Sequence, residues 1–508
     1  MNKSFMLKKI FTQKKNLLLF VFLCIVTWNI ISSYKDLGLF ADDIGTIYQL
    51  NQIHNFISLI KYSLGYDAAR DLHQIWLKVF LIISGNNWIQ NLHLIQFILY
   101  LINSILFLYI LSLLEISRVT KITIWILSIY FSAYSEVALW VHASSMILMS
   151  ALFFLIFLIL NIKLLNKNFK IKNTAAYEII LILLSILSIE TYEQPLFAIF
   201  LIIFARVLLS KYPKNNKIRF YLSIIIYFFL IILFSIFKIW TALPYQTGSE
   251  INFLNTQFFF NVFKSFSSPL IELFRFNLNN YSANVFFSLF LIIVLIINFY
   301  KYSDYEKINQ ISFVNLIKKI LLCLVLYTVS FTPLFFHYIS DRHFYIPSFF
   351  MWIGIGYFID FSIIYLKLRY KNIIIASFPL IIIAILTINA FLNFNLKKFN
   401  QIKSATIKKN FYESIINNHN IDLLCNCFYE NKIFMINFPN FYNKTIFFAH
   451  EQDVILKLLY NDNFPKIEKI SEKKKIINVK GKKVYYIYYL GIEDDNIIYK
   501  IEKNSLKF

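Results

Sequence analysis

The sequence predicts an all-α, multi-pass membrane protein that carries a small soluble α/β domain at its C-terminal end. Of its 508 residues, 58% are hydrophobic and only 15% are charged, whereas soluble domains carry roughly 25% charged residues. Apolar runs long enough to cross a bilayer recur as far as residue 394, and in lipid such runs form helices. From residue 395 onward, Lys and Asn become frequent and the apolar runs shorten. We therefore predict a transmembrane domain over residues 1–394 and a soluble domain over residues 395–508.

The basic residues predict the orientation of the chain in the membrane. Five lysines precede the first apolar segment, which covers residues 17–33: Lys3, Lys8, Lys9, Lys14 and Lys15. Later Lys and Arg clusters occupy alternate loops, and basic loops mark the cytoplasmic side of a membrane protein. About eleven spans that start from a cytoplasmic N-terminus place the C-terminal domain outside the cytoplasm. We expect a multi-pass protein of the cell's inner membrane.

The same distribution of charge argues against nucleic-acid binding. The net charge is +22, but the basic residues lie in loops and in the last hundred or so residues, rather than on one continuous face. The four cysteines, Cys24, Cys323, Cys425 and Cys427, have neither the spacing of a disulfide framework nor that of a metal site.

The first predicted outer loop, residues 34–91, contains the most informative pair of charges. Asp42 and Asp43 lie between the first spanning segment and a stretch whose apolar residues recur every three or four positions, as in an interfacial amphipathic helix. One aspartate is expected to cap that helix, since Asp is a preferred cap, and Asp43 is the better candidate. The other, Asp42 by preference, is the candidate general base.

Other ionisable residues gather at the predicted outer ends of the spans. They are Arg70, His93, Glu136, His142, Glu190, Glu193, Asp341, Arg342 and His343. Charges at membrane depth normally face a cavity or one another, so we expect a wet pocket at the outer interface. Arginine suits a phosphate as a bidentate partner, and a carboxylate can deprotonate a hydroxyl. This combination suits transfer of a sugar from a lipid phosphate whose tail enters laterally between spans.

The C-terminal domain is predicted from alternating patterns. Lys432–Pro439, Val484–Leu490 and Asn496–Lys503 have the composition of strands, and Ala449–Asp462 has helical period.

Five motifs along residues 15–350 resemble one superfamily. They are the acidic pair Asp42-Asp43; His93-Leu94-Ile95-Gln96 followed by Asn103; Ser135-Glu136-Val137-Ala138-Leu139-Trp140-Val141; Leu187-Ser188-Ile189-Glu190-Thr191; and Arg342-His343-Phe344-Tyr345-Ile346-Pro347-Ser348. Their order is similar to that of the GT-C superfamily of polyprenyl-phosphate-sugar-dependent glycosyltransferases. The branch they most resemble is that of the protein O-mannosyltransferases and the transmembrane TPR-containing O-mannosyltransferases. Ile189 stands where that family has lysine, and Asp71 where it has proline.

The resemblance implies an inverting, single-displacement hexosyl transfer on the extracytoplasmic side. The donor would be a polyprenyl-phosphate-linked sugar, and the acceptor hydroxyl would belong to a lipid, glycan or protein. Asp42 or Asp43 would act as base, Arg342 and Arg70 would hold the donor phosphate, and Glu136, Glu190, His93, His142 and Tyr345 would line and orient the pocket. The resemblance implies no certain cofactor. Some branches of the superfamily use a divalent metal, although no metal-ligand cluster is visible in this sequence.

Three other interpretations stay open from the sequence. One is a non-catalytic scaffold that holds the C-terminal domain, which the departures at Ile189 and Asp71 leave open. An O-antigen-type polysaccharide polymerase or ligase is also multi-pass, but its key residues are expected in a late outer loop, whereas the acidic pair here is early. A lipid-linked glycan transporter or flippase is expected to carry mid-membrane charges and helices broken by Gly and Pro. The chain has only nine glycines and nine prolines. The sequence names neither the sugar nor the acceptor.

Overall fold

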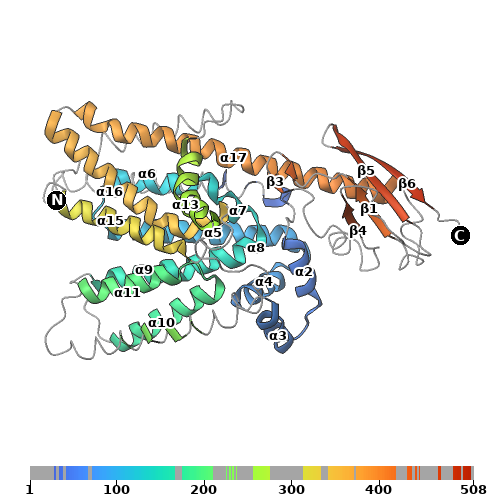
Figure 1. The fold of residues 1–508 in the computed structure, drawn as a ribbon, viewed down its shortest axis with the longest axis horizontal. Coiled ribbons are helices and arrows are strands. Elements are labelled where there is room, and N and C mark those ends of the chain that lie inside the picture. The colour runs from blue at the N-terminus through green and yellow to red at the C-terminus, as the bar shows by residue number, and fades with distance from the viewer. Residues whose placement is uncertain are drawn as a thin grey trace, which may run out of the picture.

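The computed structural model describes residues 28–29, 32, 34–37, 42–66, 71–165, 174–209, 225, 228–229, 232–233, 236, 256–274, 313–332, 341–370 and 373–418, together with the strand segments 432–436, 441–442, 445–446, 467–470, 484–493 and 496–504. Its helices lie mostly along one direction, and the strands lie beyond one end of them (Figure 1). Arg70, the predicted helix at Ala449–Asp462 and most of the first apolar segment lie outside the described residues.

The helical part begins with short elements and continues with long apolar ones. In order they are η1 (Tyr34–Asp36), α2 (Asp42–Gln52), α3 (Phe56–Tyr66), α4 (Asp71–Ser84), η2 (Gly85–Asn87), α5 (Trp88–Leu113), α6 (Arg118–Ile129), η3 (Ser132–Tyr134), α7 (Ser135–Leu139), α8 (Val141–Ala143), the π-helical turn η4 (Ser144–Leu148), α9 (Met149–Leu165), α10 (Thr174–Thr191), α11 (Leu196–Leu209), α13 (Thr256–Phe274), α15 (Phe313–Ser330), η9 (Asp341–Phe344), α16 (Tyr345–Tyr370) and α17 (Ile373–Asn418).

Several helices have the length and composition of membrane spans. Within the described residues, Leu72–Leu113, Ser145–Leu165, Arg342–Leu366 and Phe378–Phe411 are long and apolar enough to cross a bilayer, and Leu196–Arg206 is a shorter apolar helix. These helices support an integral membrane protein. The predicted total of about eleven spans remains a prediction.

The first loop differs from its prediction in detail. A single amphipathic helix was expected after Asp43, but the chain forms α2 and α3, separated at residues 53–55. Asn55 explains the break, because its side-chain oxygen accepts a hydrogen bond from the Ser58 N–H at 2.6 Å and so caps α3. The apolar helix α4 then follows within the same loop, and it leads into α5 through Gly85, whose φ of 61° suits glycine.

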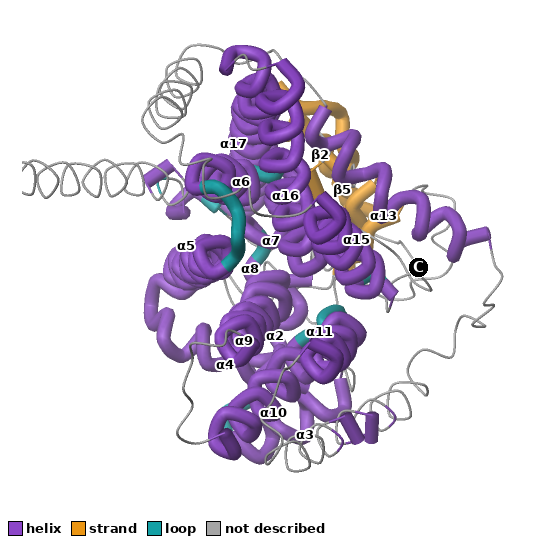
Figure 2. Tube along the Cα trace, turned by 90° about the vertical axis from the view of Figure 1, so that its left-hand side faces the viewer, coloured by secondary structure: helices purple, strands orange, loops and turns teal. Residues whose placement is uncertain are grey.

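The long helices form two groups when viewed along the bundle (Figure 2). Helices α4, α5, α9, α10 and α11 pack together in one, and α6, α15, α16 and α17 in the other. Contacts between α5 and α6 and between α11 and α15 join the groups.

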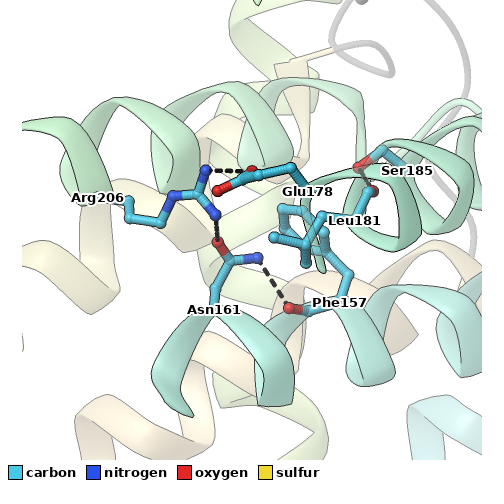
Figure 3. Close-up of polar contacts among 6 residues, drawn as sticks. All are labelled: Phe157, Asn161, Glu178, Leu181, Ser185 and Arg206. Carbon is cyan, nitrogen blue, oxygen red and sulfur yellow. Dashed lines mark hydrogen bonds and ion pairs between the residues drawn. The ribbon is translucent and has the colours of Figure 1, made fainter. Parts of the chain in front are cut away.

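A buried polar cluster connects three helices of the first group at the end away from the strands (Figure 3). The Arg206 Nη2 of α11 forms an ion pair with the Glu178 Oε2 of α10 at 2.8 Å. Its Nη1 donates to the Asn161 Oδ1 of α9 at 3.3 Å. Asn161 in turn donates to the Phe157 carbonyl at 2.8 Å. Arg206 is thus buried among helices, and its charge is paired within the protein.

The helix α17 carries the chain from the bundle to the strands. Its 46 residues measure about 69 Å at 1.5 Å per residue, more than twice the roughly 30 Å of a hydrocarbon core. Its second half, which contains Lys397, Lys398 and Lys403, therefore extends beyond the membrane and contacts β3 and β6. The predicted domain boundary after residue 394 falls inside this helix.

The strands form one four-stranded sheet and one small pair. The sheet order is β4 (Ile467–Ile470), β1 (Lys432–Ile436), β5 (Val484–Glu493), β6 (Asn496–Asn504). β1 is parallel to β4 and β5, and β5 is antiparallel to β6 from Val484↔Asn504 to Glu493↔Asn496. β2 (Phe441–Tyr442) pairs with β3 (Thr445–Ile446). The three predicted strands are confirmed, and a separate C-terminal domain remains a prediction.

Candidate active site

The short segment η9 brings together three of the predicted residues, Glu136, Arg342 and His343. The Arg342 backbone N–H donates to the Glu136 Oε2 of α7 at 3.3 Å. The His343 carbonyl accepts from the Gln194 Nε2 at 2.5 Å, and the His343 ring stacks on Tyr192 with centroids 6.4 Å apart. Segments around residues 136, 193 and 342 are therefore joined at one end of the bundle. Glu136 binds the backbone of η9, not the arginine side chain.

The Arg342 side chain is held by an aromatic ring. Its guanidinium carbon lies 5.4 Å from the centroid of the Trp140 ring, within cation–π range. Its Nε is buried and has no hydrogen-bond partner in the structure, and no carboxylate among the described residues forms an ion pair with it. Arg342 is half-buried, and a cation that is withdrawn from water is favoured by a paired anion or by hydrogen-bond acceptors. The arrangement is therefore suited to an anionic ligand.

The His93 motif on α5 holds α7 in place. The Gln96 Nε2 donates to the Val137 carbonyl at 2.9 Å and to the Trp140 carbonyl at 2.7 Å, so it occupies the end of α7. The Gln96 Oε1 lies 3.1 Å from the His93 Nδ1. Because an amide oxygen can only accept a hydrogen bond, the His93 Nδ1 carries the proton and donates it. Both side chains are fully buried. His93 thus orients Gln96, which in turn holds the segment whose Trp140 ring packs against Arg342.

Tyr345 lies in an aromatic layer directly after η9. It is buried, with its ring centroid 4.8 Å from that of Tyr134 and 5.8 Å from that of Tyr100. The Tyr134 hydroxyl contacts the Ser348 hydroxyl and accepts a hydrogen bond from the Trp352 Nε1 at 2.8 Å. This layer fixes the first turn of α16 and so the position of η9.

The helix α4 contacts the same end of the bundle. The His73 ring is 4.3 Å from the His142 ring in an edge-to-face arrangement, and the Trp76 Nε1 donates to the Thr191 Oγ1 at 3.2 Å. Thr191 directly follows Glu190 at the end of α10, and Glu190 is partly buried there. The predicted residues His142 and Glu190 therefore both lie next to α4.

The acidic pair lies at the start of α2. Capping by Asp43 predicts a helix that begins at Ile44, but α2 begins at Asp42, so both acids lie in its first turn. Negative charge in this turn is favoured by the helix dipole. α2 packs against α4 and against α8, which carries His142. The directions of the two aspartate side chains lie outside what the structure describes.

Four residues that were not predicted as site residues contact predicted ones. Trp140, which the sequence offered only as part of a motif, packs against Arg342; Tyr192 and Gln194 contact His343; and His73 contacts His142. For Tyr192 and Gln194, the sequence does contain a hint: the polar stretch Thr191–Gln194 interrupts an apolar run at the end of α10. Within the described ranges, no three His, Cys, Asp or Glu side chains are arranged to hold a metal ion.

Comparisons with known protein families and with curated proteins find no match for this chain. Among solved structures, it is similar to ArnT from Cupriavidus metallidurans in the apo state, at 9% identity and a TM-score of 0.40, over 94% of this chain and 93% of that one. It is also similar to ArnT from the same organism bound to undecaprenyl phosphate, at 10% identity and a TM-score of 0.39, over 93% of each chain. At such values the likeness alone identifies neither a family nor an activity.

Proposed function

We propose that this protein is an integral-membrane glycosyltransferase of the GT-C type. It transfers a hexose from a polyprenyl-phosphate donor to an acceptor hydroxyl at the membrane face that carries η9 and α2. That face is the extracytoplasmic side of the inner membrane. Arg342, with Arg70, binds the donor phosphate, and Asp42 or Asp43 is the base. Glu136, Glu190, His93, His142 and Tyr345 shape and orient the pocket.

The observation that carries this proposal is the state of Arg342. Its guanidinium is packed on Trp140, its Nε is buried without a hydrogen-bond partner, and no carboxylate among the described residues neutralises it. A phosphate oxygen would supply the missing acceptor and charge. Arg342 lies at the start of a helix that is long enough to span the membrane. An anion that approaches Arg342 from within the bilayer must therefore be carried on a lipid.

The proposed reaction is a single displacement. An oxygen of the acceptor attacks the anomeric carbon of the sugar while a carboxylate of the acidic pair takes the hydroxyl proton. The bond between the anomeric carbon and the phosphate oxygen breaks, and its electron pair stays on the phosphate. Arg342 stabilises the negative charge that develops on this leaving group. Attack opposite the leaving phosphate inverts the anomeric configuration.

Binding of the lipid product tests the role of Arg342. The probe is undecaprenyl phosphate, and its Kd for the purified protein in nanodiscs is measured by native mass spectrometry. A hydrogen bond to a charged group contributes about 1.5–3 kcal/mol, so Arg342→Ala should raise the Kd about 10- to 100-fold. Arg342→Lys keeps the charge but loses the planar donor set, and should give an intermediate Kd.

The matched control is Lys319→Ala, which removes a cation from the opposite end of the bundle, where Lys319 forms an ion pair with Glu115 at 2.6 Å. Its Kd should equal that of the wild type. Equal Kd values for Arg342→Ala and the wild type would refute the phosphate site.

A further inference from the structure

The helix α13 presents a row of phenylalanines that the proposed reaction does not use. Phe259, Phe260, Phe263 and Phe266 are 60%, 58%, 70% and 37% exposed. Their spacing places them along one face of the helix. The opposite face is polar and buried: Asn261 is 1% and Ser265 0% exposed. This is the reverse of the pattern of a helix on a soluble protein, whose exposed face is polar.

Contacts on the buried face fix the depth of α13 along the bundle. The Tyr327 hydroxyl donates to the Ser265 carbonyl, and Tyr327 lies one turn before the end of α15 at Ser330. The Glu272 carboxylate lies 3.3 Å from the Lys397 Nζ. Lys397 directly follows the apolar part of α17, so it marks the level at which that helix leaves the hydrocarbon. Both contacts place α13 at the boundary between hydrocarbon and head groups.

The direction of α13 agrees with that depth. It runs across α15, α16 and α17 in the side view (Figure 1), and it lies lengthwise in the view along the bundle (Figure 2). A helix that crosses the spanning helices lies in the plane of the membrane. It contacts α15 at Tyr327, and the exposed residues of α15 are also apolar, among them Leu321, Leu324 and Val325.

We propose that α13 is an interfacial anchor whose phenylalanine face lies in the acyl chains of the leaflet next to the candidate site. The partner is bilayer lipid, because an apolar row of this kind at the depth of Lys397 and next to lipid-facing α15 matches the acyl-chain boundary. The inference concerns membrane contact and does not depend on the transfer reaction.

The anchor also has a structural path to the candidate site. Phe266 packs on Tyr327 with centroids 5.8 Å apart, Tyr327 on Phe331 at 5.2 Å, and Phe331 on Phe344 at 5.3 Å. Phe344 is the last residue of η9, which carries Arg342. A fixed depth for α13 therefore helps to fix the depth of Arg342 relative to lipid phosphates.

Site-specific photocrosslinking tests the anchor. The full chain carries p-benzoyl-phenylalanine in place of Phe260 or Phe263 and is reconstituted in nanodiscs of phosphatidylcholine and phosphatidylglycerol. The matched control carries the same residue in place of Leu490, which is 62% exposed on β5, beyond the bundle. Mass spectrometry of the irradiated, delipidated protein measures phospholipid adducts.

We expect lipid adducts at positions 260 and 263 to exceed those at position 490 by about tenfold, because acyl chains surround only the first two. Equal yields at all three positions, or crosslinks from position 263 to a second copy of the chain, would overturn the anchor. A second experiment tests the anchor on the wild-type protein, without substitutions. Phospholipids with a diazirine on the acyl chain should label residues 256–274 of the wild type and leave 484–493 unlabelled, and the reverse distribution contradicts the proposal.

Discussion

At the scale of single residues, the structure distinguishes buried Arg206 from half-buried Arg342 by whether a carboxylate pairs with the guanidinium. Arg206 is neutralised by Glu178 and bonded to Asn161, so its charge is satisfied within the protein. Arg342 packs on Trp140, and no carboxylate among the side chains that the structure describes pairs with it. The first arrangement is that of a structural ion pair. The second is suited to binding an anion, which is why the proposed function depends on Arg342.

The Arg206 pair yields a prediction about stability. Glu178→Ala leaves a guanidinium, only 2% exposed in its side chain, without its countercharge, and breaking a buried pair in this way lowers the free energy of unfolding by about 3–5 kcal/mol. Glu178→Ala combined with Arg206→Met removes both charges and should recover most of that loss. The free energies are measured by reversible unfolding in mixed micelles. A double variant that is less stable than either single variant would contradict the interpretation.

Sequence reasoning at this scale found the residue types but not their contacts. Glu136 and Arg342 were both predicted for the site, and they do meet. The contact runs through the Arg342 backbone N–H, however, which no sequence pattern specifies. The contacts of Trp140 and Gln194 were not predicted, because their partners lie 202 and 149 positions away along the chain. Such pairs are fixed by packing, and apolar periodicity carries no information on them.

At the scale of elements, the ends of helices are held by side chains from distant helices. Asp360 of α16 accepts hydrogen bonds from the Ser117 N–H at 2.6 Å, the Ser117 Oγ at 2.8 Å and the Thr120 Oγ1 at 2.6 Å. It thereby completes the cap of α6 and joins α6 to α16. At the site end, Gln96 of α5 does the same for the last carbonyls of α7.

If Asp360 caps α6, its removal should destabilise the protein. Asp360→Ala leaves three buried or partly buried donors without their acceptor, so the free energy of unfolding should fall by about 2–3 kcal/mol. Glu115→Ala is the control, because this carboxylate lies nearby in sequence to Ser117, is 71% exposed and forms only a surface ion pair. It should change the free energy of unfolding by less than about 0.5 kcal/mol. Unfolding in mixed micelles measures both, and similar losses for the two variants would exclude the capping role.

The helices and strands themselves were largely predictable, and their breaks were not. Apolar runs predicted the long helices from α5 onward, apart from α13, which lies in a predicted loop, and alternation predicted β1, β5 and β6. The division between α2 and α3 depends on the Asn55 cap, and α4 is an apolar helix within a predicted loop. Local hydrogen bonds and tertiary contacts decide such boundaries, whereas hydrophobic periodicity alone does not.

At the scale of the whole molecule, the candidate site and the strands lie at the same end of the helical bundle (Figure 1). α17 extends past the bundle on the side of α2, α3 and α4, and the Lys398 Nζ donates to the Asn29 carbonyl at 2.5 Å at that end. We therefore expect the strands and the first loop to face the same compartment.

Accessibility of single cysteines tests this arrangement. In a background without native cysteines, Ile57→Cys on α3 and Leu490→Cys on β5 replace side chains that are 68% and 62% exposed. A membrane-impermeant maleimide should label both in intact spheroplasts. Leu165→Cys, at the opposite end of α9, should react only after permeabilisation. Labelling of positions 57 and 490 from opposite sides would contradict the shared location.

The central claim is that a carboxylate of α2 deprotonates the acceptor while Arg342 holds the donor phosphate. It is tested most directly in a deletion strain complemented with the wild type or with Asp42→Asn combined with Asp43→Asn. Mass spectrometry of surface polysaccharide and glycoprotein measures the transferred hexose. Undecaprenyl phosphate binding and membrane insertion serve as controls for folding. We predict that the double variant inserts, binds the lipid phosphate as the wild type does, and transfers no sugar. Full transfer by the double variant would show that neither aspartate is the base.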